Sequence, residues 1–118
     1  RDMIDYGYFA HDSRSGARFS ARIAQAGWMQ GRSSWIVGEN LAWGSGSRAT
    51  QRQMVLSWME TPGHRANIPQ GRYRAIGIGV IRGTPVQTSL GGATYTTDFG
   101  SCQKALWAGF TKNPTRFT

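Results

Sequence analysis

Two histidines and two glutamates are the rare acid–base side chains of this chain of 118 residues, and they are His11, His64, Glu39 and Glu60. Two imidazoles can bind one divalent cation and leave coordination positions open for water. A neutral imidazole can also take up or release a proton near neutral pH. The two histidines are far apart in sequence, but both lie in turn-like segments at the ends of elements, where functional side chains are often placed. The alternative interpretation is that both are ordinary turn residues.

Glu39 lies inside an apolar segment, with Val37 and Leu41 on either side of Gly38-Glu39-Asn40. A carboxylate in apolar surroundings is costly unless it is paired. Burial would raise its pKa, and a histidine or a cation beside it would lower the pKa. We therefore consider a partly buried carboxylate that meets the histidines, with a solvent-facing strand residue as the alternative.

Weaker signals surround the histidines. Ser13 follows His11 by two residues and hints at a nucleophile–base pair, although serine is common in turns. Arg65 and Asn67 follow His64 and could hydrogen-bond neighbouring backbone, or Arg65 could meet an anionic ligand. The sequence has no G-x-S-x-G segment, no phosphate loop and no dinucleotide-binding glycine pattern, and Cys102 has no adjacent base. These negatives exclude several large enzyme classes.

The composition is basic, with 14 Lys+Arg, 6 Asp+Glu and a net charge of +8. The charge could attract polyanions, but the arginines are scattered and no basic–aromatic stripe occurs, which favours a solvated surface. We therefore predict no specific nucleic-acid partner. No apolar run reaches about 18 residues, so no membrane span is predicted, and residues 1–5 do not resemble a signal peptide. A single cysteine excludes an internal disulfide framework and a cysteine-rich zinc module.

The length fits one domain over residues 1–118. Hydrophobic periodicity predicts helices that precede a pair of strands, which is typical of the α+β class. The predicted helices are 1–8, 17–26 and 48–60, the last capped by Ser47; a strand-like segment is 34–43, and the clearest strands are 75–82 and 93–101. After Ser101 we predict an irregular tail that packs Trp107 and Phe110.

Several segments, taken in order, resemble one family. They are Tyr8-Phe9-Ala10-His11-Asp12-Ser13, Gly38-Glu39-Asn40-Leu41-Ala42-Trp43-Gly44, Trp58-Met59 with Pro62-Gly63-His64-Arg65-Ala66-Asn67-Ile68, Ile76-Gly77-Ile78-Gly79-Val80 and Tyr95-Thr96-Thr97-Asp98-Phe99-Gly100. Together they are similar to the bacterial branch of the CAP superfamily, the SCP domain, which includes cysteine-rich secretory proteins, venom antigens and pathogenesis-related proteins. The resemblance implies a three-layer α-β-α sandwich with a small antiparallel sheet and a secreted, extracellular or cell-envelope location.

The resemblance also implies a central cleft. His11 and His64 match its histidines and would hold Zn²⁺ or another divalent cation. Glu39 matches its glutamate and, if the protein is an enzyme, would be the catalytic residue, as the base or by orienting the water. The remaining cleft candidates are Ser13, Asn40, Glu60, Arg65 and Asn67. The second family glutamate falls at Thr61, next to Glu60, so the acidic set differs here.

Two function classes follow from the resemblance. One is a module that binds a divalent cation, a lipid, an envelope polymer or a protein ligand without turnover. The other is a metal-assisted, protease-like hydrolase that uses the same cleft. We favour binding, because catalytic zinc usually takes three protein ligands and only two are evident here.

The family begins with a helix that precedes the first matching segment. Its absence predicts an N-terminally incomplete domain with an exposed apolar face that includes parts of Ile4, Tyr8 and the strands. Such a face favours self-association. The resemblance further implies that Cys102 pairs with a cysteine in that preceding helix.

Overall fold

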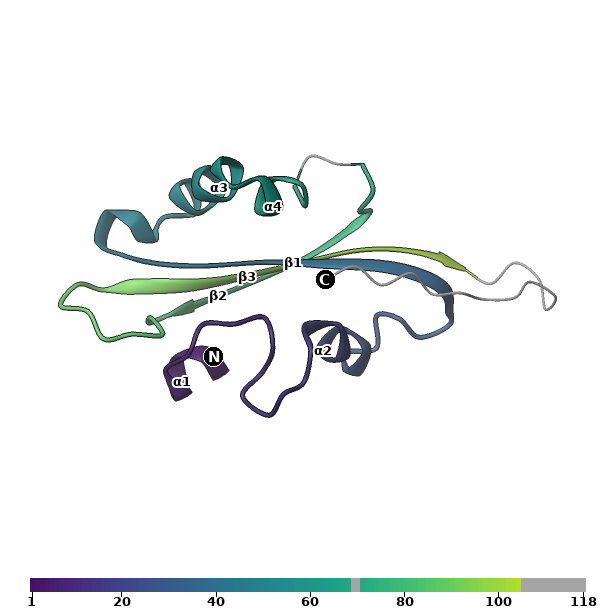
Figure 1. The fold of residues 1–118 in the computed structure, drawn as a ribbon, viewed down its shortest axis with the longest axis horizontal. Coiled ribbons are helices and arrows are strands. Elements are labelled where there is room, and N and C mark those ends of the chain that lie inside the picture. Colours follow the sequence, from purple (N-terminus) through teal and green to yellow (C-terminus); the bar gives the residue numbers. More distant parts are fainter. Residues whose placement is uncertain (69–70, 105–118) are drawn as a thin grey trace.

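The computed structural model describes residues 1–68 and 71–104, which form three layers (Figure 1). Helices α1 (Asp2–Tyr6) and α2 (Phe19–Gln25) cover one side of a sheet. Helices α3 (Gln51–Glu60) and α4 (Pro62–Arg65) cover the other side. The predicted α+β class and the α-β-α sandwich are confirmed.

The sheet of the described residues has three antiparallel strands in the order β1-β3-β2. They are β1 (Arg32–Ser45), β2 (Ala75–Arg82) and β3 (Gly92–Lys104). β1 is longer than predicted, because it pairs with β3 along nearly all of both strands. For the same reason β3 continues past Ser101, so the irregular tail was predicted to begin too early. Trp107 and Phe110 lie outside the described residues.

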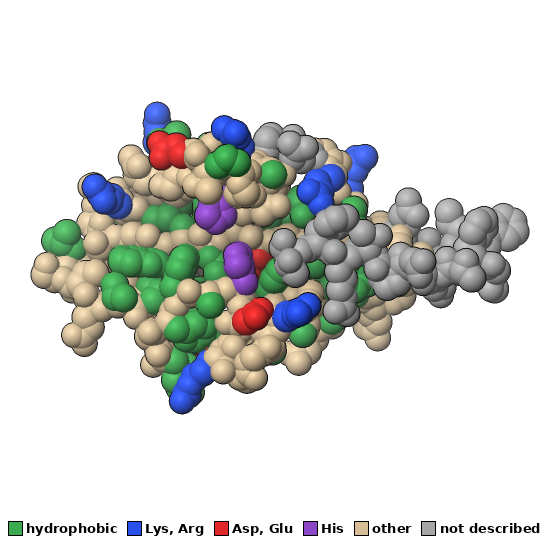
Figure 2. Space-filling view, viewed as in Figure 1, with side chains coloured by type: hydrophobic (Ala, Val, Ile, Leu, Met, Phe, Trp, Pro, Cys, Tyr) green, Lys and Arg blue, Asp and Glu red, His purple; other side chains and the backbone are tan. Residues whose placement is uncertain are grey.

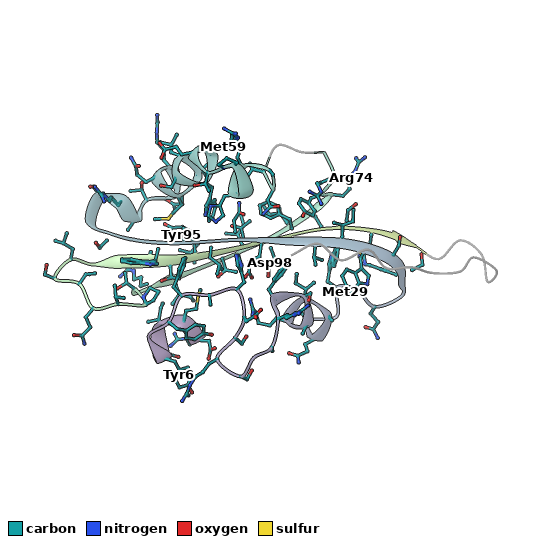
Figure 3. All side chains as sticks on the ribbon, in the orientation of Figure 1. Tyr6, Met29, Met59, Arg74, Tyr95 and Asp98 are labelled. Carbon is teal, nitrogen blue, oxygen red and sulfur yellow. The ribbon has the colours of Figure 1, made fainter. Side chains whose placement is uncertain are left out.

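Each side of the sheet carries its own apolar cluster. Phe19, Ile23 and Val37 pack together on the α2 side, and Met54, Trp58 and Tyr95 pack on the α3 side. Side chains alternate between the faces of a strand, so neighbouring residues of one strand serve opposite layers. Figure 3 shows this for β3, where Tyr95 and Asp98 point to opposite sides.

Helix α3 begins later than predicted. The 3-10 turn η1 (Gly46–Ala49) comes first, and Thr50 caps the helix by accepting a hydrogen bond from the backbone N–H of Gln53 at 3.3 Å. The prediction that Ser47 is the cap is therefore wrong. The physical reason is that residues 46–49 form a separate turn packed against the end of β1. A Cβ on Gly44 would lie 2.3 Å from the Arg48 carbonyl oxygen, so the α-helix begins only after this turn.

The outer strand β2 carries an exposed apolar row. The exposed fractions of Ile76, Ile78 and Val80 are 61%, 67% and 46%. The strands therefore expose apolar surface as expected, whereas Ile4 and Tyr8 are half-buried. Within the described part of the chain, no helix has the length and apolar character needed to cross a membrane.

Candidate functional site

The site is organised by two consecutive residues at the centre of β1. Glu39 and Asn40 are both buried, and they point to opposite faces of the sheet because side chains alternate along a strand. The residue before them is closely approached by another side chain: a Cβ on Gly38 would lie 2.5 Å from the hydroxyl oxygen of Tyr73, so any larger residue there would displace the Tyr73 ring. The Gly-Glu-Asn sequence therefore allows close packing at Gly38 and sends one polar side chain into each helical layer.

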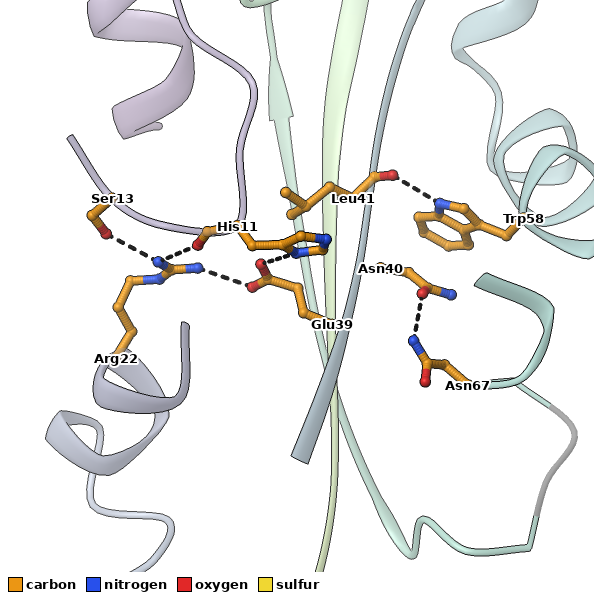
Figure 4. A network of polar contacts seen from close by, with 8 residues as sticks. All are labelled: His11, Ser13, Arg22, Glu39, Asn40, Leu41, Trp58 and Asn67. Atoms are coloured by element: carbon orange, nitrogen blue, oxygen red, sulfur yellow. Dashed lines mark hydrogen bonds and ion pairs between the residues drawn. The ribbon is translucent and has the colours of Figure 1, made fainter. Parts of the chain in front are cut away.

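On the α2 side, Glu39 holds the loop that carries His11 (Figure 4). Its Oε1 lies 2.9 Å from Nδ1 of His11, and its Oε2 accepts a hydrogen bond from Nη2 of Arg22 at 3.0 Å. The Nη1 of Arg22 also donates to the His11 carbonyl oxygen at 2.9 Å and to Oγ of Ser13 at 3.0 Å. Both oxygens of Glu39 are thus engaged, and its side chain has no solvent exposure, whereas the His11 side chain is 51% exposed.

Asp98 of β3 lies opposite Glu39 in the sheet register, and the two carboxyl groups hydrogen-bond to each other. Burial, followed by this contact with Glu39, raises the pKa of Asp98 to about 8. Burial also raises the pKa of Glu39, although the hydrogen bond from Asp98 and the charge of Arg22 oppose that shift. Adjacent carboxyl groups cannot both ionise cheaply. At neutral pH the pair therefore holds one proton and one negative charge, and that charge faces Arg22.

On the α3 side, Asn40 holds the segment that carries His64. Its Nδ2 donates to the His64 carbonyl oxygen at 3.0 Å, and its Oδ1 accepts from Nδ2 of Asn67 at 2.8 Å. The indole Nε1–H of Trp58 donates to the Leu41 carbonyl oxygen at 2.9 Å and fixes α3 against the same strand. The two histidine segments, 53 positions apart in the chain, are thus held by neighbouring residues of β1.

The two histidines gather on one face of the molecule, near the β1 edge of the sheet (Figure 2). His64 lines a groove of about 560 Å³ that continues along β1. Its other walls combine aromatic, polar and cationic side chains, among them Phe9, Trp43, Arg48, Gln53 and Trp58. The groove thus offers the imidazole of His64 among mixed polar and aromatic walls, and the half-exposed His11 lies on the same face of the molecule.

The other predicted cleft residues have different positions. Ser13 contacts Arg22, and Asn40 and Asn67 position the His64 segment. Arg65 on α4 and Glu60 on α3 are exposed. None of the contacts found within residues 1–68 and 71–104 ties either side chain to the histidines. These two residues are near His64 in the sequence, but the described contacts do not link them to the site.

Sequence reasoning missed Arg22 and Asp98. Arg22 carries no special local signal, because it lies on the polar face of a short amphipathic helix. Asp98 does carry one, since it stands between Thr97 and Phe99 in a predicted strand, as Glu39 stands in an apolar segment. Within the part of the chain that the structure describes, no three His, Cys, Asp or Glu side chains gather in a way that could hold a metal ion.

Comparison with known proteins identifies the family. The model of the cysteine-rich secretory protein family, CAP, matches residues 1–103. The chain belongs to the CAP family. This CAP domain is also 33% identical over 89 residues to a protein of Bacillus subtilis (strain 168) named "Uncharacterized protein YkwD". That alignment covers 75% of the chain but 32% of the relative, so the match spans about a third of the Bacillus protein. No solved structure matches.

The match confirms the resemblance to a bacterial CAP domain and extends over nearly all the described residues. Three of the motif segments behind that resemblance carry His11, Glu39 and His64. In this CAP domain the first and third segments both contact the middle of β1, His11 through Glu39 and His64 through Asn40.

Proposed function

We propose that this CAP domain is a secreted or cell-envelope binding module. Its cleft binds a divalent cation at His11 and His64, together with a lipid or polymer of the envelope that supplies further ligands. The observation that carries the proposal is the contact of 2.9 Å between the buried carboxylate of Glu39 and Nδ1 of His11.

The donor set fits a cation. When Glu39 accepts the Nδ1–H of His11, the lone pair of the imidazole lies on Nε2, and the ring is half-exposed. A carboxylate behind a histidine is the usual support of a metal-binding imidazole, because it fixes the tautomer and raises the basicity of the other nitrogen. His64 is the second ligand. A bound cation would attract anionic or carbonyl oxygen atoms of a ligand in the groove, and two protein ligands leave positions for those atoms.

Binding is favoured over hydrolysis by the position of Glu39. A general base must reach the water from which it takes a proton. The Glu39 side chain is fully buried, and its two oxygens already contact His11 and Arg22. Glu39 is therefore a positioning residue for His11 in this proposal, rather than a base that faces the cleft.

The test is calorimetric titration of the protein with Zn²⁺, paired with thermal unfolding in the presence and absence of the ion. Zn²⁺ should bind and raise the unfolding temperature by mass action. The double variant His11→Ala, His64→Ala should lose both effects.

Glu39→Gln should weaken Zn²⁺ binding roughly 10- to 100-fold, as is usual when a carboxylate behind a metal-binding histidine is removed. Glu60→Gln, an exposed glutamate away from the contacts described, is the matched control and should bind as the wild type does. Equal Zn²⁺ affinity of the wild type and the double variant would overturn the proposal.

The envelope ligand is tested separately. The net charge of +8 should strengthen binding to anionic vesicles or to acidic envelope polymers, and added salt should weaken that binding by screening. Co-sedimentation with each material at two salt concentrations measures the effect. A tight, sequence-selective complex with DNA or RNA would contradict this assignment.

A further inference from the structure

A second cavity lies on the opposite side of the sheet from the groove that His64 lines. It has a volume of about 260 Å³ and lies between α2 and the strands β2 and β3. Its walls are mainly apolar: Ile23, Ala26 and Trp28 line it on the α2 side, and the strands line it around Gly77 and Gly100. Neither histidine lines it, so the proposed cation ligands lie outside it, although Arg22 and Asp98, the two neighbours of Glu39, form part of its wall.

One wall of the cavity is a firmly held aromatic ring. The indole of Trp28 lies against Gly100, so closely that a Cβ on that glycine would lie 2.3 Å from the ring. On the ring itself, the guanidinium carbon of Arg32 lies 4.9 Å from the indole centroid, in cation–π geometry.

The space beside that wall exists because β2 carries a glycine there. In the sheet register, Asp98 of β3 lies between Glu39 of β1 and Gly77 of β2. Paired residues share a face of the sheet, so the missing side chain of Gly77 is on the α2 side, next to Asp98. A Cβ at Gly77 would meet no atom within 4 Å, which shows that the position opens into free space.

The charged residues that line the cavity are already neutralised by other parts of the protein. Arg22 donates to Glu39, to Ser13 and to the His11 carbonyl oxygen. Asp98 hydrogen-bonds to Glu39, and its Oδ1 is buried without a partner among the described residues. An ionic ligand would lose its hydration and gain no counter-charge from Arg22 or Asp98, the charged residues of the lining; Arg32 lies on the Trp28 ring, outside that lining. The loss of hydration is costly in apolar surroundings. A neutral ligand avoids this cost.

We propose that this cavity is a binding site for a small neutral aromatic molecule, of the size of a bicyclic ring. The apolar walls supply the driving force, and Trp28 supplies an aromatic contact. The size follows from comparison: an apolar cavity of about 150 Å³ accepts benzene, and this cavity is larger by more than half. The proposal is independent of the function proposed for the histidine cleft.

The test uses indole as the neutral probe, with indole-3-acetate and tryptamine as anionic and cationic probes of nearly the same shape. Titrations followed by backbone amide NMR should show saturable shifts at Gly77, Gly100 and Trp28 with indole. The two charged probes should bind at least tenfold more weakly, because neither charge finds a partner in the cavity.

Gly77→Leu is the deciding variant, because its side chain would enter the free space and should abolish the shifts caused by indole. Gly79→Leu is the matched control on the same strand and face; Gly79 does not line the cavity, and a Cβ there would lie 4.0 Å from the Thr96 carbonyl oxygen. Gly79→Leu should keep the affinity of the wild type for indole.

The amide spectrum of each variant reports whether it is folded. Gly77→Ala, with a smaller side chain, should weaken the binding of indole less than Gly77→Leu. Absence of saturable shifts in the wild type, equal affinity for charged probes, or unchanged binding in folded Gly77→Leu would each overturn the proposal.

Discussion

Replacing Asp98 with Asn should flatten the pH dependence of stability between about pH 4 and pH 8. The pKa of Asp98 is raised from 3.8 to about 8 in the folded protein. Between these values the folded state keeps a proton that the unfolded state has released. Stability therefore falls as the pH rises through this range, and the contribution of the bound proton is lost once the pH passes the folded pKa. An asparagine has nearly the same shape as a protonated aspartate but does not titrate.

The change in the free energy of unfolding with pH cannot exceed the effect of one bound proton. A difference of one bound proton changes the free energy of unfolding by at most about 1.4 kcal/mol per pH unit. Between pH 5 and pH 7 the ceiling is therefore about 2.7 kcal/mol. Asp98 shares its proton with Glu39 and retains some solvent exposure, so we expect roughly 1–2 kcal/mol over those two units. The other charged groups that act on the pair, Arg22, His11 and Asp12, remain in the variant and largely cancel in the comparison.

The assay is urea denaturation of both proteins at pH 5, 6, 7 and 8, with the free energy of unfolding taken from each midpoint and slope. The difference between Asp98→Asn and the wild type should shift steadily in favour of the variant as the pH rises. Asp5→Asn, at an exposed position of α1, is the control and should parallel the wild type. If the curves of Asp98→Asn and the wild type are also parallel, the buried carboxyl pair does not hold the proton assigned to it.

Two further substitutions test the packing around β1. Gly38→Ala should lower the free energy of unfolding by about 1–3 kcal/mol, because the new Cβ would lie 2.5 Å from the Tyr73 hydroxyl oxygen. Gly63→Ala, with no atom within 4 Å of its Cβ, should leave that free energy nearly unchanged in the same denaturation assay; equal losses would contradict the close approach. Trp58→Phe should cost about 1–3 kcal/mol, since it leaves the buried Leu41 carbonyl without its indole donor. A thermal unfolding midpoint equal to that of the wild type would show that this bond is not needed.

The sequence predicted the fold well where local pattern and motif agree. Strand 75–82 has the predicted bounds, and helix 17–26 differs by a residue or two at each end. The less accurate predictions share a cause, since they depend on contacts distant in sequence. β1 and β3 are extended by pairing with each other, and α3 starts late because the turn before it packs onto Gly44. Such contacts override local propensity, and no single segment reveals them.

The candidate site shows the same limit at the level of single residues. The burial of Glu39 could be anticipated, because a carboxylate inside an apolar segment needs partners. Which partners it finds depends on strand register and on the path of a loop. Asp98 reaches Glu39 only because β3 pairs with β1 in one register, and Arg22 reaches it only because the chain turns back beside His11. The spacing of residues in the sequence predicts neither the register of β3 nor the path of this loop.

The arrangement of Glu39 and Asn40 explains why this register must be kept. Successive side chains of a strand point to opposite faces of the sheet. Two consecutive residues can therefore hold loops from the two opposite layers at the same position along the strand. A slip of one residue would move every side chain to the other face. Glu39 would then face the layer that contains Met54 and Trp58, and the fully buried Asn40 would lose the contact that holds the His64 segment. Burying an unpaired carboxylate is costly, so the same two residues that position the histidines also penalise the wrong pairing of β1. The polar groups of the cleft are thus part of what specifies the sheet, and the cleft and the sheet should be lost together on unfolding.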